Sequence, residues 1–108
     1  MKSICFVMKI KTDKIKDYID IHKTENVWPE IFQNLKIAKI NKLKIYLLEN
    51  NAICYLESED PIKSLKILGQ QKTQIEWNKV TSDFMETQPE YDSTKIVEEL
   101  KNVFEYES

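Results

Sequence analysis

The side chains best suited to chemistry in this sequence are Tyr18 and His22, which lie four residues apart. On a helix, that spacing brings their Cβ atoms to about 5–6 Å from each other. Near pH 7 a neutral imidazole donates a hydrogen bond from one nitrogen and accepts one at the other, and a tyrosine hydroxyl both donates and accepts. The pair could therefore move protons at a hydroxylated ligand. The alternative is that both side chains lie in the core, each hydrogen-bonded to a backbone carbonyl.

A second set of residues could form the walls of a pocket for that ligand. The aromatic candidates are Trp28, Tyr46, Trp77 and Phe84. The carboxylates in predicted helices near them are Glu30, Glu76 and Asp83. The apolar C–H face of a sugar stacks on an aromatic ring, and Glu30, Tyr46 and Asp83 could hydrogen-bond its hydroxyls. The alternative is that the aromatic residues form an ordinary core and the carboxylates are solvated.

Several kinds of site are excluded by what the sequence lacks. One histidine and two cysteines in separate segments, Cys5 and Cys54, give none of the ligand spacings of zinc sites. A single glycine cannot build a phosphate-binding loop or the nucleophile elbow of a serine hydrolase. We therefore expect an activity that needs neither a metal nor an organic cofactor.

The charged residues bear on the choice of partner. All 16 basic residues are lysines, and 18 acidic residues bring the formal net charge to -2. Nucleic-acid binders usually carry a basic face with arginines, and a chain without arginine has no guanidinium fork for a phosphate or carboxylate. We expect a neutral small-molecule substrate and no nucleic-acid partner.

Apolar runs and cysteines bear on the cellular compartment. The longest apolar run, Ile4 to Met8, is far shorter than the roughly 20 residues of a membrane-spanning helix, and the N-terminus lacks the features of a signal peptide. We expect the two cysteines to be free thiols that pack as small hydrophobes, not a disulfide. These features predict a cytoplasmic protein with no membrane partner.

The spacing of apolar residues predicts the secondary structure. Residues 3–10 form a predicted strand, and residues 42–59 form two strands joined at Asn50-Asn51. A helix capped by Thr12 or Asp13 carries both Tyr18 and His22 on its apolar stripe. Further helices are predicted over residues 29–40, 61–68 and 72–84, and the last is expected to bury Trp77, Val80 and Phe84. Residues 95–100 look helical, and residues 103–106 are the candidate fourth strand.

This order of elements predicts an α+β fold in one domain, residues 1–108. It is the ferredoxin-like split βαβ arrangement, an antiparallel four-stranded sheet with helices on one face. Apolar residues point to both faces of each predicted strand, for example Phe6 and Val7. Because helices cover one face only, and a monomer rarely exposes more than several hundred Å² of contiguous apolar surface, we expect a homodimer packed sheet to sheet.

A series of landmarks resembles one known family. The landmarks are Tyr18 with His22, Trp28-Pro29-Glu30, Ile45-Tyr46-Leu47, Trp77 with Asp83 and Met85, and Val103-Phe104. In this order, over nearly the whole chain, they look like the L-rhamnose mutarotase family. The most distinctive part is the helix with Tyr and His that leads into Trp-Pro-Glu.

The resemblance implies a fold, an activity and residue roles. It implies a dimeric α+β barrel and a cofactor-free isomerase that interconverts the α and β anomers of a 6-deoxyhexopyranose. It also implies that His22 is the principal general acid/base, Tyr18 its hydroxyl-bearing partner and Trp77 a wall of the pocket. Mutarotation needs only groups that accept and donate protons, which agrees with the chemistry of Tyr18 and His22.

Two positions depart from the family pattern. The rhamnose-specific members typically have a second tryptophan where this chain has Asn78, and the family has a proline where this chain has Glu86. Loss of a ring removes stacking contacts worth roughly 1 kcal/mol or more. L-Fucose or another 6-deoxyhexose therefore stands beside L-rhamnose as a candidate substrate.

Two other functions remain open, because a fold does not fix a function. One is another cofactor-free enzyme on the same barrel, such as a monooxygenase or a lactone isomerase. The other is a non-catalytic ligand-binding domain in which Tyr18 and His22 are merely buried. Anomer exchange measured with and without the protein separates both from a mutarotase.

Overall fold

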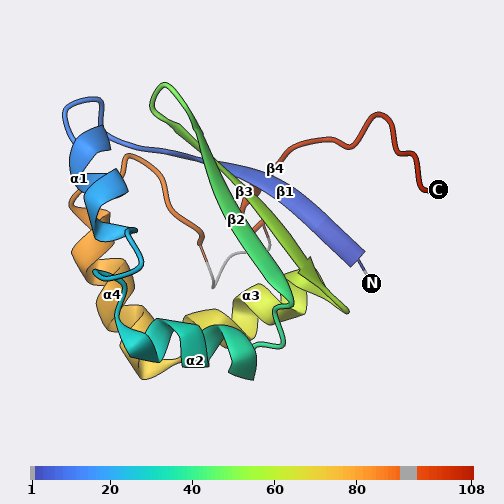
Figure 1. Ribbon diagram of the computed structural model, residues 1–108, viewed down its shortest axis with the longest axis horizontal. Helices are drawn as coiled ribbons and strands as arrows, with labels where there is room; N and C mark the ends of the chain where they lie inside the picture. The colour runs from blue at the N-terminus through green and yellow to red at the C-terminus, as the bar shows by residue number, and fades with distance from the viewer. Residues whose placement is uncertain (1, 91–94) are drawn as a thin grey trace.

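The strands of the structure form an antiparallel sheet against which the helices pack. The computed structural model describes residues 2–90 and 95–108. Its elements are β1 (Lys2–Lys9), α1 (Ile15–Ile21), α2 (Pro29–Ile37), β2 (Lys42–Leu48), β3 (Asn51–Ser58), α3 (Pro61–Gln70), α4 (Lys72–Ser82) and β4 (Glu98–Glu99) (Figure 1). In the described residues the sheet has four strands in the order β2-β3-β1-β4, each antiparallel to its neighbour. The predicted α+β, ferredoxin-like arrangement is confirmed.

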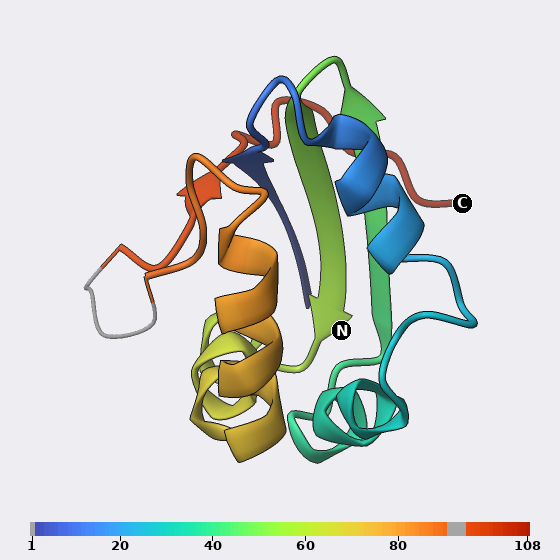
Figure 2. The same ribbon diagram turned by 90° about the vertical axis from the view of Figure 1, so that its left-hand side faces the viewer.

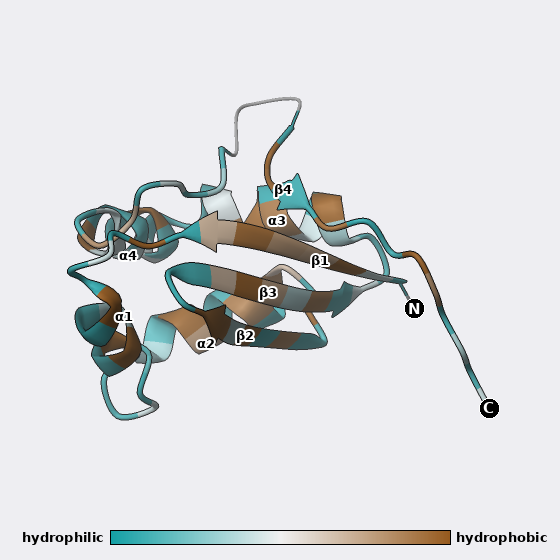
Figure 3. Cartoon of the chain, turned by 90° about the horizontal axis from the view of Figure 1, so that it is seen from above, coloured by the Kyte–Doolittle hydropathy of each residue, from teal (hydrophilic) through white to brown (hydrophobic). Residues whose placement is uncertain are grey.

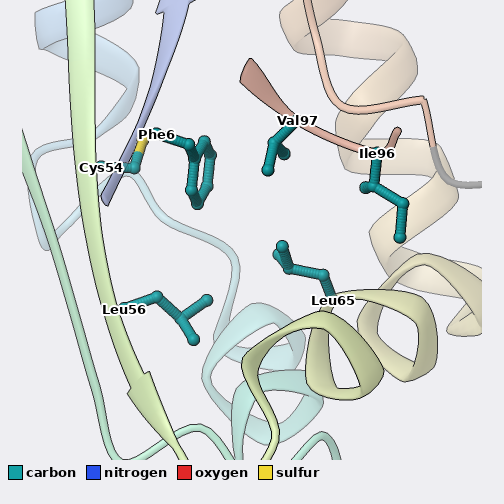
Figure 4. Packing of buried hydrophobic residues seen from close by; sticks show 6 residues of the cluster. All are labelled: Phe6, Cys54, Leu56, Leu65, Ile96 and Val97. Atoms are coloured by element: carbon teal, nitrogen blue, oxygen red, sulfur yellow. The ribbon is translucent and has the colours of Figure 1, made fainter. Parts of the chain in front are cut away.

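The helices lie on one side of the sheet (Figures 1 and 2). The residues of β3 alternate accordingly, since every second one is buried toward the helices. The largest buried cluster comprises Phe6, Cys54, Leu56, Leu65, Ile96 and Val97 (Figure 4). It joins β1 and β3 to α3 and to the segment before β4, so apolar burial ties the C-terminal part of the chain to the sheet.

A second buried cluster fixes α1 over the sheet. It contains Ile10, Tyr18, Ala52 and Met85. Ile10 and Ala52 are fully buried at the ends of β1 and β3, and Tyr18 of α1 packs on them. The backbone of Ile10 also forms an isolated bridge with Met85. The segment after α4 and the helix with Tyr18 are thereby held at one end of the sheet.

None of the helices in the described part of the chain covers the other face of the sheet, as the view from above shows (Figure 3). Pairing in the sheet puts Val7 opposite Ile53 and Ile53 opposite Tyr46, so these three side chains share this outer face. Tyr46 and Leu48 of the edge strand β2 are 58% and 61% exposed. Lysines and Glu57 lie among these apolar residues, so the predicted apolar outer face is present but mixed with charges.

The fourth strand differs from the prediction. It consists of Glu98–Glu99, whose residues pair with Val7 and Phe6, and the predicted helix over residues 95–100 does not form. Burial of Ile96 and Val97 in the core places the next residues beside β1, where Leu100 N donates a hydrogen bond of 2.7 Å to the Cys5 carbonyl. Residues 103–106 have strand propensity but pair with no strand among the residues that the structure describes, and they lie in a tail that leads away from the sheet (Figures 1 and 3).

Two local predictions, the N-cap of the first helix and the position of the β2–β3 turn, are also wrong. The residue before α1 is Lys14, which provides no side-chain cap, so neither Thr12 nor Asp13 is the N-cap. The β2–β3 turn consists of Glu49 and Asn50, and its left-handed residue is Glu49, with φ 54°. Asn50 serves a different purpose, because its amide donates to the Ile10 carbonyl at 3.0 Å and ties the turn to the end of β1.

The C-terminus of α2 yields a prediction about stability. Lys39 has φ 59°, and the amides of Lys39 and Ile40 donate to the carbonyls of Lys36 and Leu35, both at 3.0 Å, which is a Schellman motif. Because a non-glycine residue is strained at this position, Lys39→Gly is expected to raise the free energy of unfolding by about 0.5–1 kcal/mol. Urea unfolding measures the change. In contrast, Lys36→Gly inside the helix should lose about 1 kcal/mol, and a loss in both variants would contradict this explanation.

Two smaller predictions concern cysteines and membranes. Cys5 and Cys54 are free thiols, as expected. Their pairing partners, Tyr55 and Phe6, show that the two cysteines point to opposite faces of the sheet. None of the helices in residues 2–90 and 95–108 is long and apolar enough to cross a membrane.

Candidate active site

A cavity of about 330 Å³ lies between the helices and the sheet. Its sheet side is apolar and is lined by Phe6, Met8, Leu43, Ile45, Cys54 and Leu56. Its helix side includes Tyr18, His22 and Trp77. No lysine, aspartate or glutamate is among the described residues that line it. Its size falls at the lower end of ordinary ligand sites, about 300–1,000 Å³, and its lining suits a small neutral molecule.

His22 is oriented by the helix that precedes it. Its Nδ1 lies 2.7 Å from the Tyr18 carbonyl oxygen, and because a carbonyl only accepts, Nδ1 carries the proton. In the neutral ring, Nε2 then has a free lone pair, and no described residue hydrogen-bonds to it. Burial lowers the pKa of His22, with the Tyr18 carbonyl as a weaker opposing influence. His22 is therefore a neutral imidazole at pH 7, with Nε2 able to accept a proton.

Tyr18 lies against His22, with the two ring centroids 4.2 Å apart. The side chain is buried and its pKa is raised, first by burial and then by the nearby Cys54 thiol. The phenol therefore keeps its proton throughout the physiological range. No hydrogen bond joins its hydroxyl to another described residue. Tyr18 thus brings an uncharged hydroxyl to the cavity, which can donate or accept a hydrogen bond.

Trp77 continues this row of rings. Its ring lies edge-on to His22 at 5.9 Å and to Trp28 at 5.1 Å between centroids. Trp77 is 5% exposed and lines the cavity, whereas Trp28 is half-buried and lies behind it. Such edge-to-face contacts stabilise aromatic pairs. Trp77 is therefore both a wall of the cavity and the support of the His22 ring.

Other predicted site residues lie outside this cavity. Tyr46 is on the outer face of the sheet, because it pairs with Ile53 and not with a residue of the helix side. Glu30 and Asp83 are exposed at the beginning of α2 and just after α4, and neither lines the cavity. Phe84 is half-buried beside the second core cluster. The structure thus brings together Tyr18, His22 and Trp77, and separates them from the candidates for hydroxyl binding.

Polar residues occupy the helix side of the cavity, and of these the sequence pointed only to Asn78, as a departure from the family pattern. They are Gln74, Asn78 and Thr81 of α4, and Gln88 beyond it. Gln74 Nε2 donates to Asn78 Oδ1 at 3.0 Å, and Gln88 Nε2 donates to Thr81 Oγ1 at 3.1 Å. Positions 74, 78 and 81 share one helix face with Trp77, which is the signal that could have found them.

The side chains around the cavity do not form a metal site in the part of the chain that the structure describes. Within residues 2–90 and 95–108, no three His, Cys, Asp or Glu side chains lie close enough together to hold an ion. Cys54 lines the cavity, but burial raises the pKa of its thiol to about 12. It is therefore protonated and unreactive at neutral pH.

The lowered pKa of His22 can be measured directly, because the chain has one histidine. The imidazole proton signals in an NMR titration are expected to give a midpoint below the ordinary 6.5. Because the unfolded chain then takes up this proton first as the pH falls, His22 should lower the stability of the fold as the pH drops from about 6.5 through the folded-state pKa. His22→Asn should remove this part of the pH dependence. A midpoint above 6.5 would contradict the burial of the ring.

Comparisons with known proteins agree with this geometry. The family model described as L-rhamnose mutarotase matches residues 3–106. An L-rhamnose mutarotase of Shouchella clausii is 32% identical over 104 residues, covering 91% of each chain. One of Acidiphilium cryptum is 27% identical over 105 residues, covering 96% of this chain and 97% of the relative. A crystal structure of an L-rhamnose mutarotase from Formosa agariphila has the same fold, with TM-score 0.75, 19% identity, and 99% and 100% coverage. The chain therefore belongs to the L-rhamnose mutarotase family, a family of isomerases.

Proposed function

We propose that this chain interconverts the α and β anomers of a 6-deoxyhexopyranose, L-rhamnose or L-fucose. One observation carries the proposal: His22, whose Nε2 is free, and Tyr18, whose ring centroid lies 4.2 Å from that of His22, line a cavity with no charged side chain among its described lining residues. A proton acceptor, a hydroxyl and an aromatic wall are what ring opening of a neutral sugar requires.

The proposed reaction needs one proton carrier. His22 Nε2 removes the proton from the anomeric hydroxyl O1, while the C1–O5 bond breaks and a C1=O1 double bond forms. O1 and O5 are bonded to the same carbon, so the imidazolium can then deliver that proton to O5. Tyr18 donates a hydrogen bond to the sugar oxygen that carries developing charge. Rotation about C1–C2 and the reverse steps close the ring as the other anomer.

Two observations bear on which sugar is the substrate. The relatives that match the chain are named L-rhamnose mutarotases, which favours L-rhamnose. Asn78 at the cavity favours a change of specificity, because an amide offers hydrogen bonds where a tryptophan offers a stacking surface. We keep L-fucose as the alternative substrate.

Exchange NMR at the anomeric protons tests the proposal. L-Rhamnose, L-fucose and further 6-deoxyhexoses are measured with and without the protein, in the presence of a chelator because the proposed mechanism uses no metal or cofactor. Acceleration of at least one sugar is the expected result. If every sugar exchanges at its uncatalysed rate, the chain is a ligand-binding domain or an enzyme for another substrate class.

We also propose that the chain is a cytoplasmic homodimer formed by the outer face of the sheet. Apolar side chains on this face support it, as does the tail, in which Val103 and Phe104 are each 83% exposed. A second copy could cover both groups, since a two-fold interface buries the same surface twice. The free cysteines are in keeping with a reducing compartment.

The proposed dimer gives a prediction for sedimentation at micromolar concentration. Leu48→Glu should shift the wild-type dimer toward monomer with an unchanged circular dichroism spectrum, because it puts a charge in the interface. Ile37→Glu is the matched control: Ile37 of α2 is 55% exposed, similar to Leu48, but lies on the helix layer. A monomeric wild-type protein, or an equal effect of both substitutions, would contradict the interface.

A further inference from the structure

We propose that Gln74, with Asn78 and Gln88, forms an amide cluster that hydrogen-bonds the ring hydroxyls of the sugar and determines which 6-deoxyhexose is accepted. This inference rests on the proposed function and names the part of the cavity that selects the substrate. The three side chains line the cavity, Gln74 and Asn78 from α4 and Gln88 from the segment after it.

The first observation is an unpartnered atom. Gln74 is 6% exposed, and its Oε1 is buried without a hydrogen-bond partner among the described residues. Buried amide oxygens are nearly always hydrogen-bonded, because leaving one unpaired costs free energy. Gln74 also lines the cavity, so a ligand is the nearest source of the missing donor.

The cluster cannot supply that donor by rearrangement. Gln74 Nε2 already donates to Asn78 Oδ1 at 3.0 Å. Turning both amides over would let Asn78 Nδ2 donate to Gln74 Oε1, but would leave Gln74 Nε2 buried without an acceptor. Either orientation therefore leaves one buried amide group of Gln74 in need of a partner. A sugar hydroxyl is able to serve in both cases, since it donates and accepts.

The rest of the cluster is held in place by the protein. Gln88 Nε2 donates to Thr81 Oγ1 at 3.1 Å and to the Asn78 carbonyl at 3.3 Å, and Thr81 Oγ1 donates to the same carbonyl at 3.2 Å. These bonds fix the segment after α4 against the helix. The amide of Asn78 is thus presented on a rigid wall, which favours discrimination between ligands.

The position of the cluster relative to the reacting atoms favours a role in specificity. Gln74 and Asn78 flank Trp77 on α4, and the Trp77 ring contacts His22. Gln74 and Asn78 are about 6 Å apart along the helix axis at 1.5 Å per residue. A pyranose with its anomeric end at His22 would extend its other hydroxyls along this helix. L-Rhamnose and L-fucose differ in the orientation of ring hydroxyls, which hydrogen bonds detect better than a stacking ring does.

The test replaces the amide by an apolar side chain of similar size. Gln74→Leu removes the unpartnered oxygen, so the stability to urea should stay the same or rise. Its dissociation constant for the preferred sugar, measured by NMR titration, should rise about tenfold, the order expected for one lost hydrogen bond. The ratio of dissociation constants for L-rhamnose and L-fucose should move toward one. Gln33→Leu, an exposed glutamine of α2, is the matched control and should change neither quantity.

A second variant and a set of deoxy sugars test the amide cluster independently of Gln74→Leu. Asn78→Trp, which replaces the partner amide by a ring, should shift the ratio of the two dissociation constants toward preference for L-rhamnose. Deoxy sugars tested on the unaltered protein remove the hydroxyl from the ligand instead, and at least one should bind about tenfold more weakly. Unchanged sugar ratios in both variants, or a loss of stability in Gln74→Leu with unchanged affinity, would overturn the inference.

These readouts separate the two proposals. Binding to the His22→Ala variant requires no catalysis, so sugar preference there tests the amide cluster alone. If the wild-type protein accelerates anomer exchange but the amide variants keep its sugar ratios, only the cluster is wrong. If sugars bind with an amide-dependent preference but no exchange is accelerated, only the proposed reaction is wrong.

Discussion

His22→Ala is expected to slow the catalysed anomer exchange by about 10²–10⁴-fold, the usual cost of losing a general acid/base. The reason is geometric. Nδ1 is held by the Tyr18 carbonyl at 2.7 Å, which leaves Nε2 as the cavity's proton acceptor, and the lowered pKa keeps it unprotonated at pH 7. The rates are measured by exchange NMR on the sugar that the wild-type protein accelerates most.

Controls separate a catalytic role from a structural one. The His22 ring also packs on Tyr18 and Trp77, so the unfolding of each variant is measured alongside its rate. His22→Asn can keep a donor near the Tyr18 carbonyl but lacks a basic nitrogen, so it should be as inactive as His22→Ala. Lys23→Ala, which removes an exposed ion pair with Asp20, should leave the rate unchanged. If His22→Asn exchanges sugars at the wild-type rate, His22 is a core residue and the mechanism is wrong.

The acid limb of the rate profile follows from the same pKa. Because burial lowers the pKa of His22, the imidazole remains unprotonated at pH values at which an exposed histidine is already charged. The catalysed rate is therefore expected to persist below pH 6.5 and to fall only as the pH passes through the lowered value. This profile is measured on the unaltered protein after subtraction of the uncatalysed exchange.

Helix periodicity explains why part of the site could be predicted from the sequence. Four-residue spacing on a helix brings two side chains together whatever else the chain does, so Tyr18 and His22 were found from their spacing. Alternation along a strand likewise separates Phe6 from Val7. It does not tell which set the helices cover, so Tyr46 could be a pocket candidate in the sequence and an outer-face residue in the structure.

Long-range packing explains what could not be predicted. Residues 103–106 have the higher strand propensity, yet burial of Ile96 and Val97 brings Glu98–Glu99 to the edge of β1. Propensity is local, whereas the choice of strand depends on which apolar residues the core buries. The place of Gln74 in the cavity could not be predicted for the same reason, since amides on a helix are usually solvated and only the packing of α4 over the cavity buries this one.

Trp77→Ala is expected to lower the free energy of unfolding by about 3–5 kcal/mol, the usual cost of removing a buried aromatic ring. Trp77 is 5% exposed and lies between the rings of His22 and Trp28, so its loss removes two edge-to-face contacts and enlarges the cavity. The same substitution frees the His22 ring to turn, so anomer exchange should slow as well. Urea unfolding and exchange NMR measure the two effects separately.

Trp28→Ala is the matched control for that loss. Trp28 is half-buried, contacts Trp77 from behind and does not line the cavity, so its removal should cost less stability and leave the position of His22 nearly unchanged. Trp77→Phe keeps a ring against His22 and should recover much of both the stability and the rate. If Trp28→Ala slowed exchange as much as Trp77→Ala at matched stability, Trp77 would not contribute to the rate by supporting the His22 ring.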